Sequence, residues 1–455
     1  MQIIADLHIH SKFSRACSRD LVLEKIDETC RIKGVNVVGT GDFTHPEWFL
    51  EMRGKLVEKE KGLYILKNNQ ETRNNNQINS KFQTPNFEQT RFVCSSEIAC
   101  IYSKGGKVRR LHIVVLAPSL EAVEKINKEL GKIGNLKADG RPILGLDVEK
   151  LAEIVLGVDE RCMVIPAHIW TPWFAMFGSK SGFDSVEECW GQMSNNIFAI
   201  ETGLSSDPQM NWRVKNLDRM SIISNSDAHS LPNIGREANV LEIPPLSFPL
   251  AKGGTKGGLS YDEIIKIIRG KNIKDPARNG AGFLQTIEFY PEEGMYHFDG
   301  HRACRISMMP GEAKQNKNIC PRCKKILTIG VLNRVEELAE KNRDDKYVDN
   351  SRPSFVKLVE LDKIIAESLG IKSRSAGRVK AEYDNLIKKF GNEFEILLKV
   401  KTEKIAESGW LEIAEGIQRV REGRVMIEPG FDGQYGKIKI FGKEKNVKKQ
   451  MSLFG

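Results

Sequence analysis

The stretch Ala5 to Ser11, ADLHIHS, decides how the rest of the chain is interpreted. It completes a short apolar run, and one residue separates its two histidines, His8 and His10. Side chains two positions apart on a β-strand point to the same face, so both imidazoles would project together from the strand's C-terminal end. The stretch therefore predicts one strand that delivers two histidine ligands to a metal ion.

Further ligand-type side chains follow other apolar runs in the first half of the chain. Histidines and carboxylates without cysteine are typical of two or three divalent metals such as Zn, Mn, Mg or Fe. Glu97 is placed to bridge two ions, and Asp227 with His229 to complete the second site. Asp42 and His45 are either both ligands, or one of them orients a ligand. The candidate metal ligands are His8, His10, Asp42, His45, Glu97, His112, His168, Asp227 and His229, with Asp227 and Glu97 as the catalytic candidates.

Such a cluster of metals predicts phosphoester hydrolysis. Clustered ions lower the pKa of a bridging water, clamp the non-bridging phosphate oxygens and steady the leaving oxygen. The expected reaction is in-line attack of a metal-bound hydroxide on phosphorus.

Strand-like runs alternate with helical patterns from residue 1 to about 245, for example LVLEKIDETCRIKG before VNVVGTG. This alternation predicts an α/β fold with a parallel sheet or barrel, whose chemistry lies at the carboxyl ends of the strands. The ligand-type residues occupy those ends. Residues 67–90 are polar and Asn/Gln-rich, which predicts a surface insertion. AKGGTKGG, at 251–258, marks a second break in the pattern.

A separate metal site is indicated in the second half. Cys320-x-x-Cys323 follows a His301-x-x-Cys304 pair, and two ligand pairs joined by a loop form the closed tetrahedral shell of a structural zinc. His297 is the alternative histidine ligand. A redox function is disfavoured because no thioredoxin-like unit surrounds the CxxC. The prediction is one structural Zn on His301, Cys304, Cys320 and Cys323.

Amphipathic helix patterns follow Gly330, and the strand-like segment RVMIEPGFDGQYGKIKIF, with a Gly-rich turn, comes after them. The predicted units are a metal-binding barrel at 1–250, a linker and helix at 251–282, a zinc-binding module at 283–335, a helical, basic C-terminal domain at 336–441 and a flexible tail at 442–455.

The charge of the chain suits a polyanionic partner. Its formal net charge is +9, and the last 85 residues carry 18 Lys and Arg against 12 Asp and Glu. No apolar run approaches the ~20 residues of a membrane span, and the N-terminus has no signal-peptide layout. Nine scattered cysteines form no disulfide framework. We therefore expect a cytoplasmic protein without a membrane partner.

The motifs DLHIHS, GTGDFTHP, SSEIA, LHIVVLAP, PAHIWTPW and SNSDAHS resemble those of the PHP metallophosphoesterase family over residues 1 to 245. HIWTPWFAMFGSKSGF, YHFDGHRAC with ICPRC, LNRVEELA and PGFDGQYGKIKIF resemble the endonuclease Q type of DNA repair enzyme within that family. The resemblance implies a distorted (β/α)7 PHP-type barrel with several metals. It also implies hydrolysis of the phosphodiester 5′ to a deaminated base (uracil, hypoxanthine, xanthine) or an abasic site, leaving 3′-hydroxyl and 5′-phosphate ends. One departure is Arg15, in a segment where many PHP proteins carry an Asp ligand.

The stretch 170–177, WTPWFAMF, directly follows His168 and should lie beside the metals. An enzyme that examines a base takes it out of the stack, so one of these aromatics is expected to stack on the flipped base or to fill its gap. Packing of a long loop is the alternative. Basic residues would contact phosphates, with a steep salt dependence. The candidate substrate-binding residues are Trp170, Trp173, Phe174, Phe177, Lys180, Arg109, Arg110 and Arg236.

Two other functions stay open: a PHP phosphatase on a small phosphate monoester such as histidinol phosphate, and a non-catalytic DNA-binding PHP module. The second half of the chain argues against the first, and the near-complete ligand set against the second. The tail, with Gln450, Leu453 and Phe454, resembles a shortened Q-x-x-L-x-x-F-F peptide that docks on DNA sliding clamps. It predicts a PCNA-like clamp as a partner besides DNA.

Overall fold

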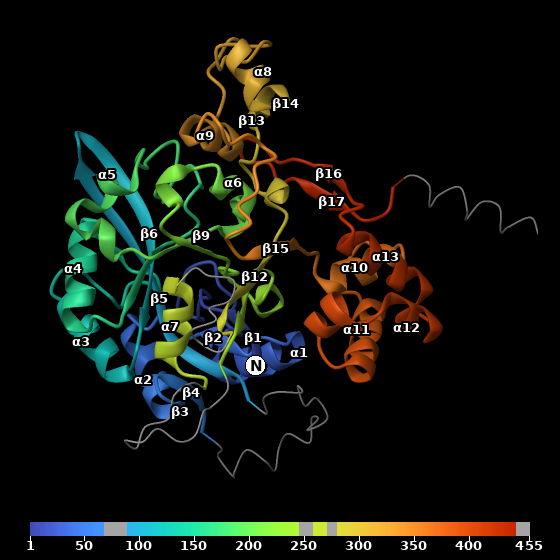
Figure 1. The fold of residues 1–455 in the computed structure, drawn as a ribbon, viewed down its shortest axis with the longest axis horizontal. Helices are drawn as coiled ribbons and strands as arrows, with labels where there is room; N and C mark the ends of the chain where they lie inside the picture. Colours follow the sequence, from blue (N-terminus) through green and yellow to red (C-terminus); the bar gives the residue numbers. More distant parts are fainter. Residues whose placement is uncertain (68–88, 245–257, 271–279, 443–455) are drawn as a thin grey trace, which may run out of the picture.

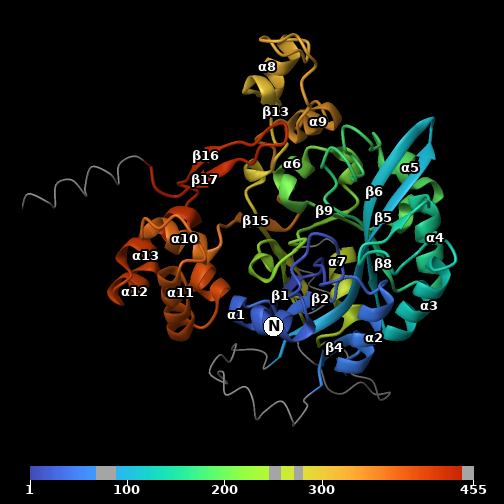
Figure 2. The same ribbon diagram turned by 180° about the vertical axis from the view of Figure 1, so that it is seen from behind.

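The computed structural model describes residues 1–67, 89–244, 258–270 and 280–442. A mixed sheet lies at its centre and helices cover it, as Figures 1 and 2 show from opposite sides. Its short central strands are buried along their whole length, as apolar strands between two layers must be. The strand order is β15-β12-β11-β1-β2-β5-β4-β3, and β6 joins β5 to β8. The bounds are β1 (Gln2–Asp6), β2 (Val37–Gly39), β3 (Leu56–Glu60), β4 (Leu63–Leu66), β5 (Arg91–Lys104), β6 (Lys107–Ala117), β8 (Met163–Pro166), β11 (Ala238–Glu242), β12 (Gly282–Glu288) and β15 (Ser354–Lys357).

Parallel strands place several carboxyl ends at one edge of the fold. β1 is parallel to β2, and β2 to β5. A second parallel pair, β9 (Ala199–Glu201) and β10 (Ser221–Ile223), lies against β8. A parallel bridge between Ile9 and Ala228 joins the segments that leave β1 and β10. Residues far apart in the sequence therefore meet where these strands end.

The alternation of strands and helices predicted a parallel sheet or barrel, but the sheet is mixed. β6 runs antiparallel to β5 and to β8, and β11 antiparallel to β1. The reason lies in the turn between β5 and β6, where Gly105 and Gly106 both have positive φ, 64° and 72°. Two such residues form the tight turn of a hairpin and return the chain directly into the neighbouring strand.

The helices of the first half pack their apolar positions on this sheet. In α1, Leu23, Ile26 and Cys30 recur at helical spacing and are buried. Gly34 ends the helix with φ 90°, and its N–H donates to the carbonyl of Cys30. The helices are α1 (Leu23–Lys33), α2 (Pro46–Lys55), α3 (Leu120–Leu130), α4 (Val148–Val158), α5 (Val186–Trp190), α6 (Pro208–Trp212) and α7 (Tyr261–Gly270). The predicted α/β fold is confirmed.

The second half forms two groups of elements beside this body. A small module projects from it, and a group of helices lies to one side (Figure 1). The hairpin of β16 and β17 lies between the two in both views (Figure 2). The predicted helical C-terminal region is confirmed. The module contains β13 (Asp299–His301), β14 (Ile306–Met308), α8 (Pro310–Gln315) and α9 (Val331–Leu338); the helical group contains α10 (Leu361–Ser368), α11 (Gly377–Phe390), a π-helix (Glu395–Lys399), α12 (Thr402–Glu407) and α13 (Leu411–Arg421), followed by β16 (Met426–Glu428) and β17 (Lys437–Lys439).

The sheet extends beyond the predicted end of the barrel. β12 pairs with β11, and β15 pairs with β12, so strands that the sequence assigned to the zinc module and the C-terminal domain belong to the central sheet. The central sheet therefore crosses the predicted boundaries at 283 and 336. The division into domains stays a prediction. Most of the predicted insertion at 67–90, of the break at 251–258 and of the tail lies outside the described residues. No helix of the described segments is long and apolar enough to cross a membrane.

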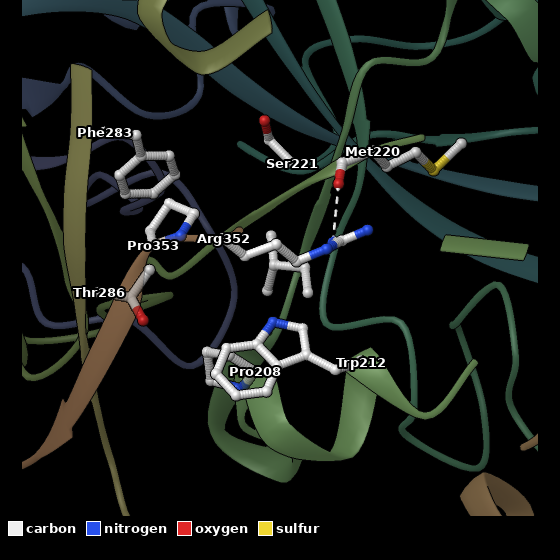
Figure 3. A pocket seen from close by; sticks show the side chains of 9 residues that line it. Pro208, Trp212, Met220, Ser221, Phe283, Thr286, Arg352 and Pro353 are labelled. Carbon is white, nitrogen blue, oxygen red and sulfur yellow. Dashed lines mark hydrogen bonds between the residues drawn. The ribbon is translucent and has the colours of Figure 1, made fainter. Parts of the chain in front are cut away.

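Arg352, just before β15, fixes this addition to the sheet. Its side chain is buried, and its guanidinium donates to the carbonyls of Met220 and Leu217 at 3.1 and 3.0 Å. Figure 3 shows it in a small pocket with Trp212 and Phe283. This pocket contains none of the candidate metal ligands.

A buried ion pair joins the helical group to α1. Lys33 Nζ lies 3.4 Å from an oxygen of Glu393, and both side chains are less than a tenth exposed. Glu393 also accepts hydrogen bonds from the Leu361 amide at 3.1 Å and the Tyr383 hydroxyl at 2.6 Å. The carboxylate therefore holds α10 and α11 to the first half of the chain.

We expect Glu393→Ala to lower the free energy of unfolding by about 3 kcal/mol or more, because it leaves the buried Lys33 ammonium uncompensated. Denaturant unfolding followed by circular dichroism measures this change. The matched control is Glu395→Ala, which breaks the more exposed pair with Lys399 and should cost less than about 1 kcal/mol. Equal costs for both variants would contradict the structural role of the buried pair.

Candidate functional site

Two groups of ligand-type side chains meet at the carboxyl ends of the strands. In each group the ligand atoms lie within 4.8 Å of one another. They come from the segments after β1, β8 and β10 and from the neighbouring strands β5 and β6. The first group contains His8, His10, Glu97 and Asp227, and the second contains Glu97, His112 and His168.

Glu97 belongs to both groups and is fully buried. Its Oε2 faces the first group, 3.4 Å from His10 Nε2 and 3.8 Å from His8 Nε2. Its Oε1 faces the second, 2.8 Å from His112 Nδ1 and 3.1 Å from His168 Nε2. Burial alone would raise the pKa of Glu97, but His112 and Arg141 hold it well below its usual value. Glu97 thus points one carboxylate oxygen toward each group, which is how a carboxylate that bridges two ions is arranged.

The first two histidines are oriented for a metal. Nδ1 of His8 donates to Glu201 at 3.0 Å, which leaves Nε2 with a lone pair, and this buried nitrogen has no hydrogen-bond partner among the described residues. Nδ1 of His10 likewise donates to Asp42 at 3.0 Å, while its Nε2 lies 2.9 Å from Asp227. A carboxylate behind each imidazole is the outer shell that metal-ligating histidines have. The residues therefore fit divalent ions.

Asp42 lies behind this group instead of in it. Its Oδ2 accepts hydrogen bonds from the Ser11 amide at 2.7 Å and from the hydroxyls of Ser11 and Ser14 at 2.6 and 2.8 Å. With Oδ1 on His10, both oxygens are engaged, so Asp42 is placed to orient the His10 imidazole. His45 caps α2 and stacks on Phe13 at 4.2 Å, outside both groups. The prediction that it is a ligand finds no support in this geometry.

His229 also lies outside both groups, although its ring is 4.6 Å from that of His10. Its Nδ1 donates to the Asp227 carbonyl at 2.8 Å, so the lone pair is on Nε2, as in a metal ligand.

The backbone is strained at three residues of the site. Asp42, His168 and Asp227 have positive φ values of 48°, 30° and 46°, each costing about 1–3 kcal/mol, and such strain concentrates at functional sites.

Two residues of the site were missed in the sequence. Glu201 follows the apolar residues of the run FAIET and is the last residue of β9, so the rule that found the other candidates would have found it as well. Besides His8, it accepts a hydrogen bond from the His168 amide at 3.0 Å and thus touches both groups. Arg141, whose Nη1 lies 2.9 Å from Glu97 Oε2, follows no apolar strand and had no such signal.

The candidate structural zinc ligands also converge. His301, Cys304, Cys320 and Cys323 place their ligand atoms within 4.8 Å of one another in the projecting module. Backbone N–H groups of Cys323 and Arg322 outweigh burial and lower the pKa of Cys320 to about 6, which favours the thiolate that zinc binds. The alternative ligand, His297, lies outside this group, where its buried ring stacks on Phe298.

The aromatic stretch divides into packing residues and one exposed residue. Trp170 and Phe177 are buried against each other at 5.1 Å, so packing explains them and they cannot reach a base. Phe174 packs on the ring of His112 at 4.6 Å. Trp173 is 38% exposed and meets Tyr296 edge to face at 5.6 Å. Trp173 is the exposed one of the four predicted aromatics, and Phe174 is half-buried.

The candidate basic residues also differ in their exposure to solvent. Arg109 is buried, with its guanidinium over the ring of Phe183 at 3.9 Å and paired with Glu188 at 3.0 Å, so it supports the fold and not a phosphate. Lys180 is exposed, and Arg110 and Arg236 are half-buried. Those three stay predicted phosphate contacts.

Solved structures match the fold of nearly the whole chain. The lesion-specific endonuclease Q of Pyrococcus furiosus covers 99% of the chain and 99% of its own length, with 27% identity and a TM-score of 0.77. The chain is a structural homologue of endonuclease Q. A complex of endonuclease Q with a 27-mer duplex that carries an abasic lesion at the active site matches 98% of both chains, with 28% identity and a TM-score of 0.77. The resemblance to endonuclease Q and to this type of enzyme, predicted from the motifs, is confirmed.

Sequence relatives extend the comparison. Residues 360–424 match the MJ0043 C-terminal domain family. Protein MJ0043 of Methanocaldococcus jannaschii is 30% identical over 272 residues, which is 59% of this chain but only 31% of that protein. YqxK of Bacillus subtilis is 28% identical over 96% of this chain and 99% of its own length.

We expect Glu201→Gln to weaken metal binding at the first group about 10–100-fold, because His8 loses the carboxylate that fixes its tautomer. Competition with a chelator, followed by elemental analysis, measures the loss, and the wild type treated in parallel serves as the reference. The matched control is Glu288→Gln. Burial raises the pKa of Glu288 to about 8, so its carboxyl is largely protonated at pH 7, and the amide retains the hydrogen bonds to Thr202 and Ser224. Equal metal affinity in both variants would contradict the orienting role of Glu201.

Proposed function

We propose that the chain is a divalent-metal-dependent endodeoxyribonuclease of DNA repair. It cleaves the phosphodiester 5′ to a deaminated base (uracil, hypoxanthine or xanthine) or an abasic site and leaves 3′-hydroxyl and 5′-phosphate ends. The observation that carries this proposal is the whole-length match to lesion-specific endonuclease Q, including the complex with an abasic duplex.

The chemistry of the site supports the same reaction. Two or three divalent ions, when bound, would activate water and neutralise charge on the phosphate. His8, His10 and Asp227 would hold the first ion, His112 and His168 the second, and Glu97 would join them. Glu201 and Asp42 keep the imidazoles in place through hydrogen bonds. Because these groups are preorganised and mostly buried, little reorganisation is needed during the reaction.

Trp173 is our candidate for contact with the lesion. It follows the ligand His168 by five residues, and the loop between them is fixed by Thr171, whose hydroxyl donates to the Trp173 carbonyl at 2.9 Å. Its exposed indole could stack on the extruded nucleotide or fill the gap that this nucleotide leaves.

The alternatives have less support. A phosphatase for a small monoester would need only the first half of the chain, whereas the match to endonuclease Q includes the zinc-type module and the helical region. A non-catalytic module would not need two converging ligand groups that share a buried carboxylate. The predicted clamp-binding residues, Gln450, Leu453 and Phe454, lie outside the described residues, and no clamp is part of this proposal.

A nicking assay on labelled duplexes with uracil, hypoxanthine, an abasic site or no lesion tests the proposal. With divalent metal, the wild type should cut immediately 5′ to each lesion and leave the undamaged duplex intact. Asp227→Ala should lower the rate by about 10²-fold or more, because it removes a ligand of the first group. Asp20→Ala, which changes only an exposed carboxylate paired with Lys25, should cut like the wild type. Absence of nicking on every duplex by metal-loaded wild type would reject the assignment, and a small phosphomonoester would become the next substrate to test.

Trp173→Ala should reduce the preference for lesion over intact DNA about tenfold, the value of one stacking contact, without changing metal content. The ratio of single-turnover rates on the two duplexes measures this preference. Trp410→Ala is the matched control, since that indole packs on Phe390 in the helical group. A proportional loss on damaged and undamaged DNA would exclude stacking.

A further inference from the structure

Arg141 lies at the metal centre although it cannot be a metal ligand. Its Nη1 donates to Glu97 Oε2 at 2.9 Å, the oxygen that faces the first ligand group. Its side chain is still 25% exposed. A permanent cation thus connects the buried bridging carboxylate with the surface of the site.

Asp139 positions this cation together with a second one. Its Oδ1 accepts hydrogen bonds from the backbone amides of Arg141 at 3.1 Å and Arg15 at 3.2 Å, and its Oδ2 lies 3.2 Å from Nε of Arg15. The Arg15 side chain is 80% exposed. One carboxylate therefore holds two arginines on two loops at the edge of the metal centre.

The loop that carries Arg141 packs closely against Asp42 and Ser14, behind the first ligand group. The Gly140 amide donates to the Phe13 carbonyl at 3.0 Å. A Cβ atom at Gly140 would lie 2.3 Å from Asp42 Oδ2 and 2.4 Å from Ser14 Oγ, so only glycine allows this approach. Arg141 is consequently held next to the groups that orient His10.

We propose that Arg141 and Arg15 form a binding site for consecutive backbone phosphates of the DNA. Arg141 donates to a non-bridging oxygen of the phosphate that is cleaved, and Arg15 contacts a neighbouring phosphate. This inference rests on the proposed function and adds residues to it.

Charge and geometry support this contact. A guanidinium has several N–H groups in a planar fork, which suits a phosphate as well as a carboxylate. The contact with Glu97 is made by Nη1, and the side chain is 25% exposed. Other N–H groups of Arg141 can therefore donate to a phosphate while the contact with Glu97 stays. If Arg141 only neutralised Glu97, its removal would affect stability and metal binding but not the contact with one phosphate.

A chemical double-mutant cycle separates these roles. Equilibrium binding of chelator-treated protein is measured with two abasic duplexes, one natural and one with a methylphosphonate, which lacks the charge, at the phosphate 5′ to the lesion. Wild type should bind the methylphosphonate duplex about tenfold more weakly, because a charge-assisted hydrogen bond is lost. Arg141→Ala should bind both duplexes equally. The inference fails if wild type and Arg141→Ala discriminate equally between the duplexes.

Rates and salt dependence give independent readouts. Arg141→Ala should slow nicking by about 10²-fold or more at unchanged metal content, with partial rescue by Arg141→Lys. Arg15→Ala should lower the slope of log K against log salt by about 0.9. Arg161→Ala, a surface arginine paired with Asp159, is the control for both measurements. Lack of nicking by wild type rejects the proposed function alone, whereas nicking that is insensitive to Arg141→Ala rejects the phosphate contact alone.

Discussion

The buried carboxylate of Glu97 is the constraint on which the site depends. An ionised carboxylate without exposure to water is stable only if opposite charges and donors surround it. Here the sheet supplies them: His112 from the adjacent strand, His168 from the end of β8 and Arg141 from a loop all reach its oxygens. A binding site for cations follows directly, because bound divalent ions satisfy the same charge more completely than neutral imidazoles do.

The strands explain how such distant residues meet, and the outer shell explains why they stay in place. Parallel strands bring His8 and Asp227 to one edge, while the β5–β6 hairpin places Glu97 and His112 two registers apart on neighbouring strands. Hydrogen bonds that the imidazoles donate to Glu201 and Asp42 then fix the rings that face inward. Positive φ at Asp42, His168 and Asp227 indicates that the surrounding contacts, and not local preference, determine the backbone there.

Sequence patterns predicted the parts of this site that follow strand periodicity. His8 and His10 are two residues apart and both belong to the first group, as the pattern requires, although β1 ends at Asp6 and both histidines follow it. Patterns could not separate a ligand from the group that orients it, because Asp42 and Glu97 have the same chemistry and differ only in what surrounds them. Nor could they distinguish Arg109 from Arg110, since adjacent residues on a strand face opposite sides and only the fold decides which side is filled. Arg141 gave no signal because its place depends on a close approach at Gly140.

Residues of the second half also fix the conformation of a loop in the first half of the chain. Arg334, in α9, is buried and donates to the carbonyls of Phe177 and Phe183 at 3.1 and 3.0 Å. Both residues lie in the loop that contains the aromatic stretch, and Phe177 is the last residue of that stretch. The conformation of that loop, next to His168, thus depends on a residue near the zinc-type module. A barrel of this sequence without its second half would leave these carbonyls to water and the loop less constrained. This dependence is a physical reason why a match over the whole chain says more about its chemistry than a match of the barrel alone.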